Sequence, residues 1–270
     1  MSKSMNKQYQ EFEIFAKELA IQGGKKTLEY FHQDISVERK ADESPVTIAD
    51  RETELTMRKI ISERYPDHAV VGEEFGGVPR NNEWEWILDP IDGTKSFIRG
   101  VPLYTTLVAL VHNGTPVVGV IHAPAIGETV SAYKGGGCRD QSNRPVTVSE
   151  CTALSDAWYM TTDPHDFALR HPAISETLLR SCRSSRTWGD GYGYMLVARG
   201  AVDVMLDPAM SAWDIAPLSV VIREAGGVFT SMAGETDDLG TSAVAASTEK
   251  LHNEVMAIIR KQAGSPGAGE

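Results

Sequence analysis

The chain has 270 residues, 41 % of them apolar, which is enough to bury a sizeable core in one large domain or in two closely packed halves. Its 37 acidic and 26 basic residues give a formal net charge of −11, and no basic run offers a footprint for a phosphate backbone, which excludes nucleic acid as a partner. No apolar stretch approaches the roughly 20 residues that cross a bilayer, and the polar N-terminus lacks the apolar core of a signal peptide, so we expect a cytoplasmic protein without a membrane partner.

Two helices are predicted near the N-terminus. Apolar residues recur at near-helical spacing over 8–32, although the glycine pair at 23–24 weakens this helix. Charged residues interleaved with apolar ones predict a second helix over 52–64, which stops before Pro66 and has Asp50 near its N-terminal end. The apolar face of the first helix should belong to the core.

The first predicted strands end in acidic residues. The apolar segment 69–71 leads into Glu73 and Glu74, and the segment 84–88 leads directly into the motif DPIDGT at 89–94. Both segments have the pattern of short buried strands. Carboxylates are therefore expected at the C-terminal ends of two neighbouring strands.

An antiparallel sheet is predicted downstream, because segments rich in β-formers at 104–112 and 116–122 flank Asn113 and Gly114, which tolerate positive φ in a hairpin. Further strands are expected over 128–133, 145–149 and 157–161, and helices over 164–180, 190–199, 214–225 and 248–262. The fold class is therefore α+β, with layers of helices and sheets. The tail at 263–270 is rich in glycine and is expected to be mobile.

The three cysteines, Cys138, Cys151 and Cys182, are odd in number and widely spaced. None of them belongs to a CxxC pair. The pattern indicates ordinary reduced thiols and neither a disulfide framework nor a structural zinc site.

The motif at 89–94 suggests a cation site. In a straight strand Asp89 and Asp92 would point to opposite faces. Pro90 cannot donate to a sheet ladder, so we expect the strand to end there and the chain to turn, bringing both carboxylates and the Ile91 carbonyl to one space. Like charges this close require a neutralising cation, and oxygen ligands suit a hard ion such as Mg²⁺.

A phosphate site is expected beside this cation. Gly93 permits close backbone approach and Thr94 can cap a following helix, so the amides of 93–96 would present donors to an anion. Lys95 lies near this site, although a solvated surface role fits it equally well. The alternative is that Asp-Pro and Asp-Gly make a surface turn, which turn statistics alone favour. The acidic end of the neighbouring strand shifts the balance toward a metal site.

Three separated blocks resemble the inositol monophosphatase superfamily of magnesium-dependent, lithium-sensitive phosphatases. The blocks are GEE at 72–74, WILDPIDGT at 86–94, and WDIA at 213–216 followed by EAGG at 224–227, in the family's order. The resemblance runs through most of 10–262. It implies a five-layered αβαβα sandwich, a single catalytic unit over 1–262 made of two packed halves of about 1–150 and 151–262, and a homodimer.

The resemblance also implies two or three Mg²⁺ ions in each active site. Glu73, Asp89 and the Ile91 carbonyl would hold the first ion. Asp89, Asp92 and Asp214 would hold the second, so that Asp89 bridges the two. Such a pair of ions lowers the pKa of bound water, neutralises phosphoryl oxygens and stabilises the departing alkoxide.

The catalytic residues implied by the resemblance surround the attacking water. A weaker third Mg²⁺ near Glu73 would help to activate this water, and Asp50 with Thr94 would orient it. The amides of Gly93 and Thr94 would take the phosphate. The haloacid dehalogenase phosphatases, a rival class, carry their nucleophilic aspartate in DxDGT, whereas the DxxD spacing found here disfavours an aspartyl-phosphate mechanism.

The second half of the chain carries the expected substrate contacts. The segment RTWGDGYGY at 186–194 looks like the block typical of the histidinol-phosphatase branch, which favours L-histidinol phosphate over inositol phosphate. Asp207 stands where inositol-specific members carry a glutamate. Asp190 and Asp207 could supply negative charge to the ammonium and imidazole of histidinol, although Asp190 could equally cap a helix beginning at 191. Arg186 could pair with these acids or with the phosphate, but such arginines are more often solvated or structural.

We therefore expect a Mg²⁺-dependent phosphomonoesterase of histidine biosynthesis that converts L-histidinol phosphate to L-histidinol and phosphate. The closest alternative is an inositol-1-monophosphatase or a broad sugar-phosphate phosphatase of the same superfamily. A non-catalytic relative that binds phosphorylated metabolites is disfavoured, because clustered carboxylates are costly to hold without a metal. Branches acting on nucleotide 3′-phosphates or fructose bisphosphate would need more basic residues than Arg183 and Arg186.

Overall fold

The computed structural model describes residues 3–39, 45–77, 82–236 and 238–263. The α-helices are α1 (Lys3–Leu28), α2 (Ile48–Arg64), α3 (Thr94–Phe97), α4 (Pro164–Arg170), α5 (Pro172–Ser181), α6 (Asp190–Ala198), α7 (Ala212–Glu224) and α8 (Glu249–Ala263). The strands are β1 (Val37–Arg39), β2 (Pro45–Thr47), β3 (Ala69–Gly72), β4 (Trp84–Asp92), β5 (Thr105–His112), β6 (Thr115–Ala123), β7 (Glu128–Tyr133), β8 (Gly137–Asp140), β9 (Pro145–Val146), β10 (Trp158–Met160), β11 (Ser184–Arg186), β12 (Val204–Asp207), β13 (Val228–Thr230) and β14 (Ala243–Ala246). The tail that we predicted to be mobile lies, from residue 264 onward, outside the described residues.

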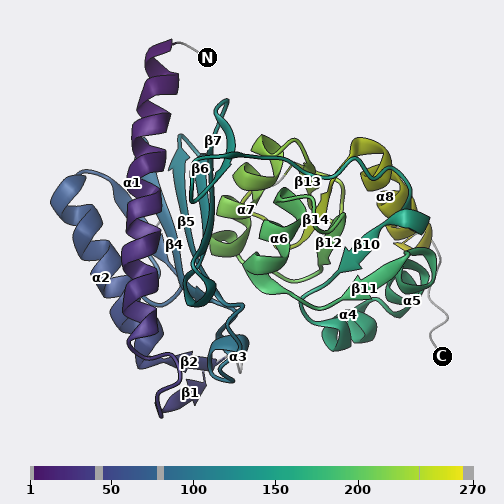
Figure 1. Ribbon diagram of the computed structural model, residues 1–270, viewed down its shortest axis with the longest axis horizontal. Helices are drawn as coiled ribbons and strands as arrows, with labels where there is room; N and C mark the ends of the chain where they lie inside the picture. The colour runs from purple at the N-terminus through teal and green to yellow at the C-terminus, as the bar shows by residue number, and fades with distance from the viewer. Residues whose placement is uncertain (1–2, 40–44, 78–81, 237, 264–270) are drawn as a thin grey trace.

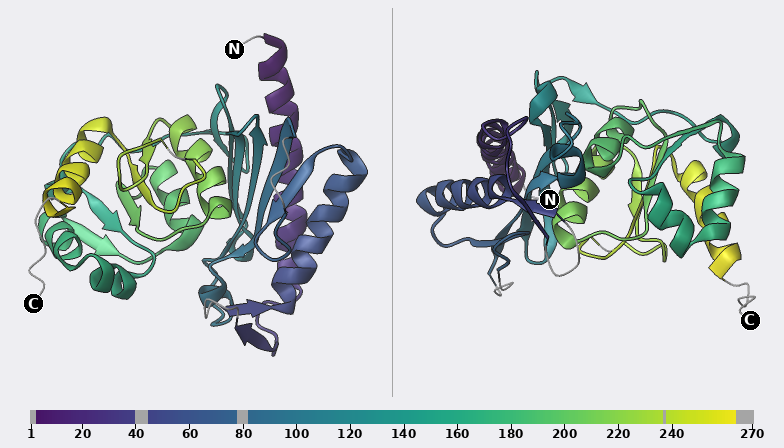
Figure 2. Two further views of the ribbon diagram at one scale, coloured as in Figure 1. Left: turned by 180° about the vertical axis from the view of Figure 1, so that it is seen from behind. Right: turned by 90° about the horizontal axis from the view of Figure 1, so that it is seen from below.

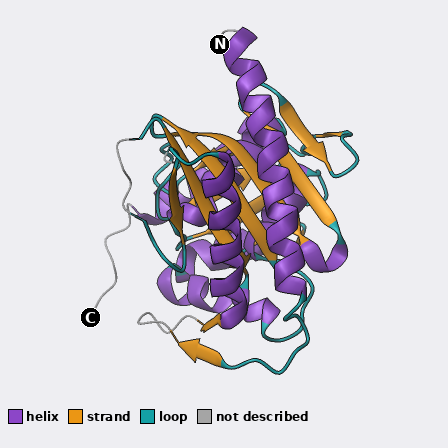
Figure 3. Cartoon of the chain, turned by 90° about the vertical axis from the view of Figure 1, so that its left-hand side faces the viewer, coloured by secondary structure: helices purple, strands orange, loops and turns teal. Residues whose placement is uncertain are grey.

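The elements stack in five layers (Figure 1, Figure 2). α1 and α2 lie side by side across one face of a seven-stranded sheet of order β3-β4-β5-β6-β7-β8-β9 (Figure 3). α6 and α7 separate this sheet from a five-stranded sheet of order β11-β10-β12-β14-β13, and α4, α5 and α8 cover its far side. The predicted α+β fold with αβαβα layers is confirmed.

Apolar side chains fill the spaces between the layers. Phe12 and Leu19 of α1 pack with Trp86 of β4 in the first interlayer core, which confirms that the apolar face of the first helix is buried. Tyr194 of α6 and Leu107 of β5 belong to the central core between the two sheets. This central packing holds the two sheets in a defined relative position, which matters for a site built from both.

The glycine pair in α1 marks a close approach of the helix to its neighbours. A Cβ on Gly24 would lie 2.6 Å from the ring of His122, and one on Gly23 would lie 2.8 Å from Sδ of Met57. The pair therefore stands inside the helix, where its lack of side chains lets α1 pack closely, and the helix ends at Leu28, four residues before the predicted end.

The local predictions hold best where the signal is short-range. The hairpin between β5 and β6 is confirmed, with φ of 48° at Asn113 and 77° at Gly114. The predicted helix over 164–180 is instead two helices, because Pro172 has no amide hydrogen and restricts His171. The predicted strand over 145–149 shortens to two residues, and β8 and β11–β14, all of three or four residues, were not predicted.

Two further observations concern chemistry and length. Cys138, Cys151 and Cys182 are free thiols, as predicted. Cys138 is buried, and burial raises the pKa of its thiol to about 12, so it is inert as a nucleophile.

No helix among the described residues combines the length and the apolar character needed to span a bilayer.

Candidate active site

A bulge in β4 brings Asp89 and Asp92 to the same face of the sheet. The strand continues through Pro90 to Asp92, so our prediction that it ends at the proline is wrong. Asp89 pairs with Leu107 and Asp92 pairs with Thr105, so three steps along β4 match two along β5. The extra residue shifts the side-chain alternation by one, and a proline is tolerated at such a position because no ladder hydrogen bond is required there.

Asp214 completes a cluster of three carboxylates. One oxygen each from Asp89, Asp92 and Asp214 lies within 4.8 Å of the others. Asp89 is buried, and its Oδ1 has no hydrogen-bond partner among the described residues. A buried oxygen without a donor, on a residue that shares its cluster with two more carboxylates, would be satisfied by a bound cation. The donor set therefore fits a hard divalent ion.

The electrostatics of the cluster agree with this fit. Burial, reinforced by the charge of Asp92, raises the pKa of Asp214 to about 8. Burial raises the pKa of Asp92 to about 6 against the opposing effect of its hydrogen bonds. The pKa of Asp89 is raised well above its usual value, first by burial and then by the charge of Glu73 and the two other acids. The ionised cluster therefore requires a nearby positive charge.

Asp50 and Asp214 are held by the same local device. Each is the third residue of its helix and accepts, through Oδ2, a 2.8 Å hydrogen bond from the amide of the N-cap residue, Thr47 or Ser211. The signal is present in the sequence as TxxD at 47–50 and SxxD at 211–214, the pattern of a capping box with aspartate as its acid. It explains why α2 and α7 begin four and two residues before the predicted starts.

Thr94 connects Asp50 to the bulge. Its Oγ1 lies 3.0 Å from the carbonyl oxygen of Ile91 and 3.4 Å from Oδ1 of Asp50. Asp50 is fully buried, and burial raises the pKa of its carboxyl group to about 6. Gly93 has a φ of 85° and precedes the short helix α3, which Thr94 begins. The structure therefore brings Asp50, Ile91, Gly93 and Thr94 into one group beside the carboxylate cluster.

Glu54, which sequence analysis missed, positions the loop that carries Glu73. Glu54 is buried, pairs with Arg58 at 2.7 Å and accepts a 2.7 Å hydrogen bond from the amide of Glu74. A Cβ on Gly72 would lie 2.1 Å from its carboxylate, so glycine is required at the start of this loop. In the sequence Glu54 looks like any glutamate four residues before an arginine on an exposed helix.

The start of α6, in the second half of the chain, orients the carboxylate of Asp92 by hydrogen bonding. The amide of Gly191 donates a 2.6 Å hydrogen bond to Oδ2 of Asp92, and the hydroxyl of Thr105 donates to the same oxygen. A Cβ on Gly191 would lie 2.6 Å from this oxygen. The contact is long-range, so no local pattern in the sequence could have revealed it.

Asp190 faces the first half of the chain. The helix begins at Asp190 with Gly189 as its N-cap, so Asp190 is not the capping residue of a helix from 191. Its amide donates to Oγ1 of Thr162 at 2.9 Å, and its carboxylate lies so close to Gly93 that a Cβ there would be 2.8 Å away. Burial, followed by the charge of Asp92 and other acids, raises the pKa of Asp190 well above its usual value.

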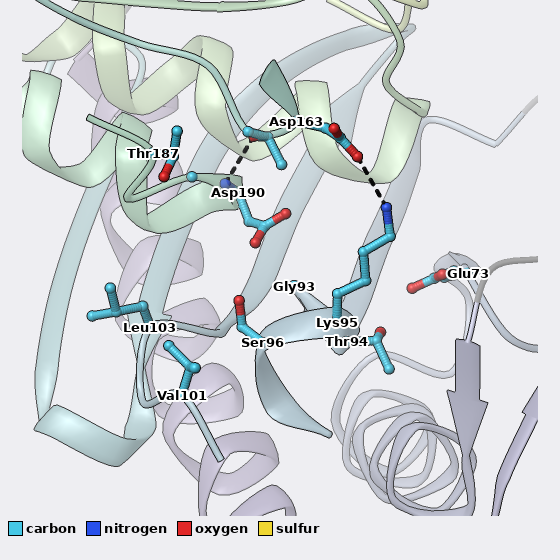
Figure 4. A pocket seen from close by; sticks show the side chains of 12 residues that line it. Glu73, Gly93, Thr94, Lys95, Ser96, Val101, Leu103, Asp163, Thr187 and Asp190 are labelled. Atoms are coloured by element: carbon cyan, nitrogen blue, oxygen red, sulfur yellow. Dashed lines mark hydrogen bonds and ion pairs between the residues drawn. The ribbon is translucent and has the colours of Figure 1, made fainter. Parts of the chain in front are cut away.

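A cavity of about 310 Å³ opens beside these groups (Figure 4). It is lined by Glu73, Gly93, Thr94, Lys95, Ser96, Val101, Leu103, Thr162, Asp163, Thr187, Gly189 and Asp190. Lys95 crosses it from α3 to Asp163 before α4, with 3.2 Å between Nζ and Oδ2. Loops and helix starts from both halves of the chain therefore line one cavity.

Two predicted substrate contacts lie outside the lining of this cavity. Asp207 is buried, and its carboxylate accepts hydrogen bonds from the hydroxyls of Thr161, Thr162 and Tyr194 and from the amide of Thr162. Arg186 is exposed, with its guanidinium 5.4 Å from the ring centroid of Trp158. Sequence analysis did not separate these two from Asp190, because all three are polar residues near a glycine-rich or acidic motif.

Comparisons with known proteins identify relatives of the whole chain. Residues 8–264 match the model of the inositol monophosphatase family. The histidinol-phosphatase of Chlorobaculum parvum is 40 % identical over 248 residues, covering 90 % of this chain and 95 % of that protein. The histidinol-phosphatase of Mycobacterium tuberculosis is 40 % identical over 232 residues, covering 83 % and 87 %. The solved structure of the Thermotoga maritima IMPase has a TM-score of 0.84 at 28 % identity, covering 92 % of this chain and 96 % of that one.

Proposed function

Because this chain belongs to the inositol monophosphatase family, we propose that it is a Mg²⁺-dependent phosphatase that hydrolyses L-histidinol phosphate to L-histidinol and inorganic phosphate. The observation that carries the chemistry is the cluster of Asp89, Asp92 and Asp214, in which Oδ1 of Asp89 has no hydrogen-bond partner within the part of the chain that the structure describes. The substrate is supported by the two relatives named histidinol-phosphatase at 40 % identity.

The acidic residues of both halves would hold the ions. Glu73, Asp89 and the carbonyl of Ile91 would bind one Mg²⁺, and Asp89, Asp92 and Asp214 would bind a second. When bound, Mg²⁺ lowers the pKa of water and neutralises charge on the phosphoryl oxygens. The hydrogen bonds that Gly191 and Thr105 donate to Asp92 support this role, because they leave one oxygen of Asp92 for the cluster.

Asp50 and Thr94 would orient the attacking water. With its proton donated to Oδ1 of Asp50 rather than to the nearer Ile91 carbonyl, the hydroxyl of Thr94 would accept a hydrogen bond from the attacking water. A carboxyl pKa of about 6 suits a group that takes part in proton transfer near neutral pH. The amides of Gly93 and Thr94, at the start of α3, would donate to the phosphoryl oxygens, since both residues line the cavity.

The test measures phosphate release from L-histidinol phosphate and from myo-inositol 1-phosphate, with Mg²⁺ and with a chelator. We expect Mg²⁺-dependent hydrolysis with a large preference for the histidinol ester. Asp214→Asn should lower kcat/KM by at least about a hundredfold, whereas Asp166→Asn on the exposed face of α4 should match the wild type. Preference for the inositol ester would identify an inositol-1-monophosphatase or a broader sugar-phosphate phosphatase, and inactivity on both would contradict the proposal.

A further inference from the structure

We infer that Asp163 selects substrates that carry an ammonium group, and that Lys95 is its counter-ion until such a substrate binds. The inference rests on the proposed function, because it takes a phosphate ester bound beside Gly93 and Thr94 as its starting point. It assigns a role to an ion pair that neither the cation site nor the attack of water uses. The substrate class that it names is a short aminoalkyl phosphate.

The ion pair crosses the cavity from one half of the chain to the other. Lys95 extends from α3, and its Nζ lies 3.2 Å from Oδ2 of Asp163, which precedes α4 (Figure 4). Both residues line the cavity, and their side chains are 76 % and 42 % exposed. An ion pair this exposed contributes little to stability, so it can be exchanged at low cost.

The two oxygens of Asp163 have different partners among the described residues. Oδ1 accepts a 3.0 Å hydrogen bond from the amide of Asp166 and so caps α4, while Oδ2 contacts Lys95. The cap fixes the orientation of the carboxylate and leaves Oδ2 pointing across the cavity. Asp163 is therefore a rigidly held anion whose present partner is on a flexible side chain.

The binding of a phosphate ester would change the partner of Lys95. A phosphate at the amides of Gly93 and Thr94 places a dianion next to the following residue in the chain, and Lys95 is attracted more strongly to a dianion than to a single carboxylate. Oδ2 of Asp163 then needs a new cation. An ammonium group on the same substrate supplies it, so that one ion pair is exchanged for two.

A neutral polyol phosphate cannot complete this exchange. It would provide the dianion for Lys95 but only hydroxyl groups for Asp163, which would lose its ionic partner. Of the other acids in the lining, Glu73 belongs to the first half and Asp190 lies against Gly93 with a raised pKa, so Asp163 is the anion that the second half presents to the substituent. The wall formed by the second half therefore favours a cationic substituent.

The experiment compares L-histidinol phosphate with its deamino analogue, in which hydrogen replaces the amino group. Asp163→Asn removes the charge but retains a good helix cap, so the variant should fold. In Asp163→Asn we expect kcat/KM for L-histidinol phosphate to fall about tenfold, because one charge-assisted contact with its ammonium group is lost. For the deamino analogue, kcat/KM should change less than twofold. Asp166→Asn, on the same helix but outside the cavity, is the matched control and should affect neither ester.

The outcomes separate this inference from the proposed function. Equal losses on both esters, or no loss on either, would overturn the selection of an ammonium group by Asp163 while leaving the phosphatase activity in place. Wild-type protein that hydrolyses neither ester in Mg²⁺ would overturn the proposed substrate, and the inference with it. Lys95→Met should raise KM for both esters, because in the substrate complex the ammonium group of Lys95 would contact the phosphate that both esters carry. A rise in KM restricted to the amino ester would also contradict the exchange of partners.

Discussion

Asp92 and Gly191 are joined by a 2.6 Å hydrogen bond between the carboxylate Oδ2 of the former and the amide of the latter. Asp92 is the last residue of β4 in the first half of the chain, and Gly191 lies near the start of α6 in the second half. The bond therefore joins the central helical layer to the seven-stranded sheet. A residue of the proposed cation site is thus oriented by the packing of one half against the other. Changes at this junction should therefore alter cation affinity as well as stability.

Thr105→Val should weaken Mg²⁺ binding by about tenfold to a hundredfold, because the hydroxyl of Thr105 donates to the carboxylate of Asp92 and such outer contacts tune ligand orientation. Titration calorimetry of the metal-free protein with Mg²⁺ measures the change. Thr53→Val is the control, since the buried hydroxyl of Thr53 has no partner among the described residues and its removal should leave affinity unaltered. Similar affinities in the two variants would refute the role of Thr105.

The stability of the metal-free protein should depend on the protonation of Asp214. Its pKa is about 8 in the folded chain and near 4 when unfolded. Between these values the folded state binds a proton that the unfolded state has released, so this group's stabilising contribution is complete below about pH 4 and is lost as the pH rises to about 8.

In a chelating buffer, the melting temperature of the wild type relative to Asp214→Asn should therefore decrease from pH 5 to pH 8. Saturating Mg²⁺ should reverse the trend, because the ion binds the deprotonated cluster and stabilises the folded state by mass action. Thermal unfolding followed by circular dichroism provides the comparison. A difference in melting temperature that is constant with pH would show that Asp214 does not titrate in this range.

Asp207→Asn should destabilise the fold by roughly 2 kcal/mol or more, because an amide nitrogen would replace an oxygen that accepts two buried hydrogen bonds. Activity should fall to the same extent on L-histidinol phosphate and on a neutral ester, since Asp207 lies outside the lining of the cavity. Urea unfolding and steady-state kinetics test the two parts. A loss confined to the histidinol ester would instead indicate direct contact with the substrate.

Gly24→Ala should destabilise the protein by about 1–2 kcal/mol, although alanine favours a helix by up to about 1 kcal/mol. The new Cβ would lie 2.6 Å from the ring of His122 and 2.8 Å from Cβ of Pro124, neither of which is the end of a flexible chain. Gly23→Ala, one residue earlier, meets Sδ of the flexible Met57 at 2.8 Å and should be tolerated much better. Equal unfolding midpoints in urea would contradict this account of the helix packing.

Local features of the fold were accessible from the sequence because short-range patterns encode them. Asn113 and Gly114 favour positive φ, so the hairpin could be located without knowledge of the rest of the chain. Helical periodicity located most of the long helices, and the predicted strand over 157–161 contains β10, while the short strands β11–β14 of the same sheet carry too little pattern to be recognised. The break at Pro172 was also visible in the sequence, although our prediction joined α4 and α5 across it.

The sequence by itself determined which acids stand at the ends of β3 and β4 and that Asp92, Gly93 and Thr94 are consecutive, because these are properties of adjacent residues. The sequence and its family resemblance also predicted that Asp89, Asp92 and Asp214 converge, whereas only the tertiary structure decided that a bulge inside β4 turns the first two to one face and that internal hydrogen bonds occupy Asp207. The tertiary structure also placed Asp163 opposite Lys95. Each of these relationships depends on strand register or on packing between distant segments, which is settled by burial across the whole chain and leaves no local signature.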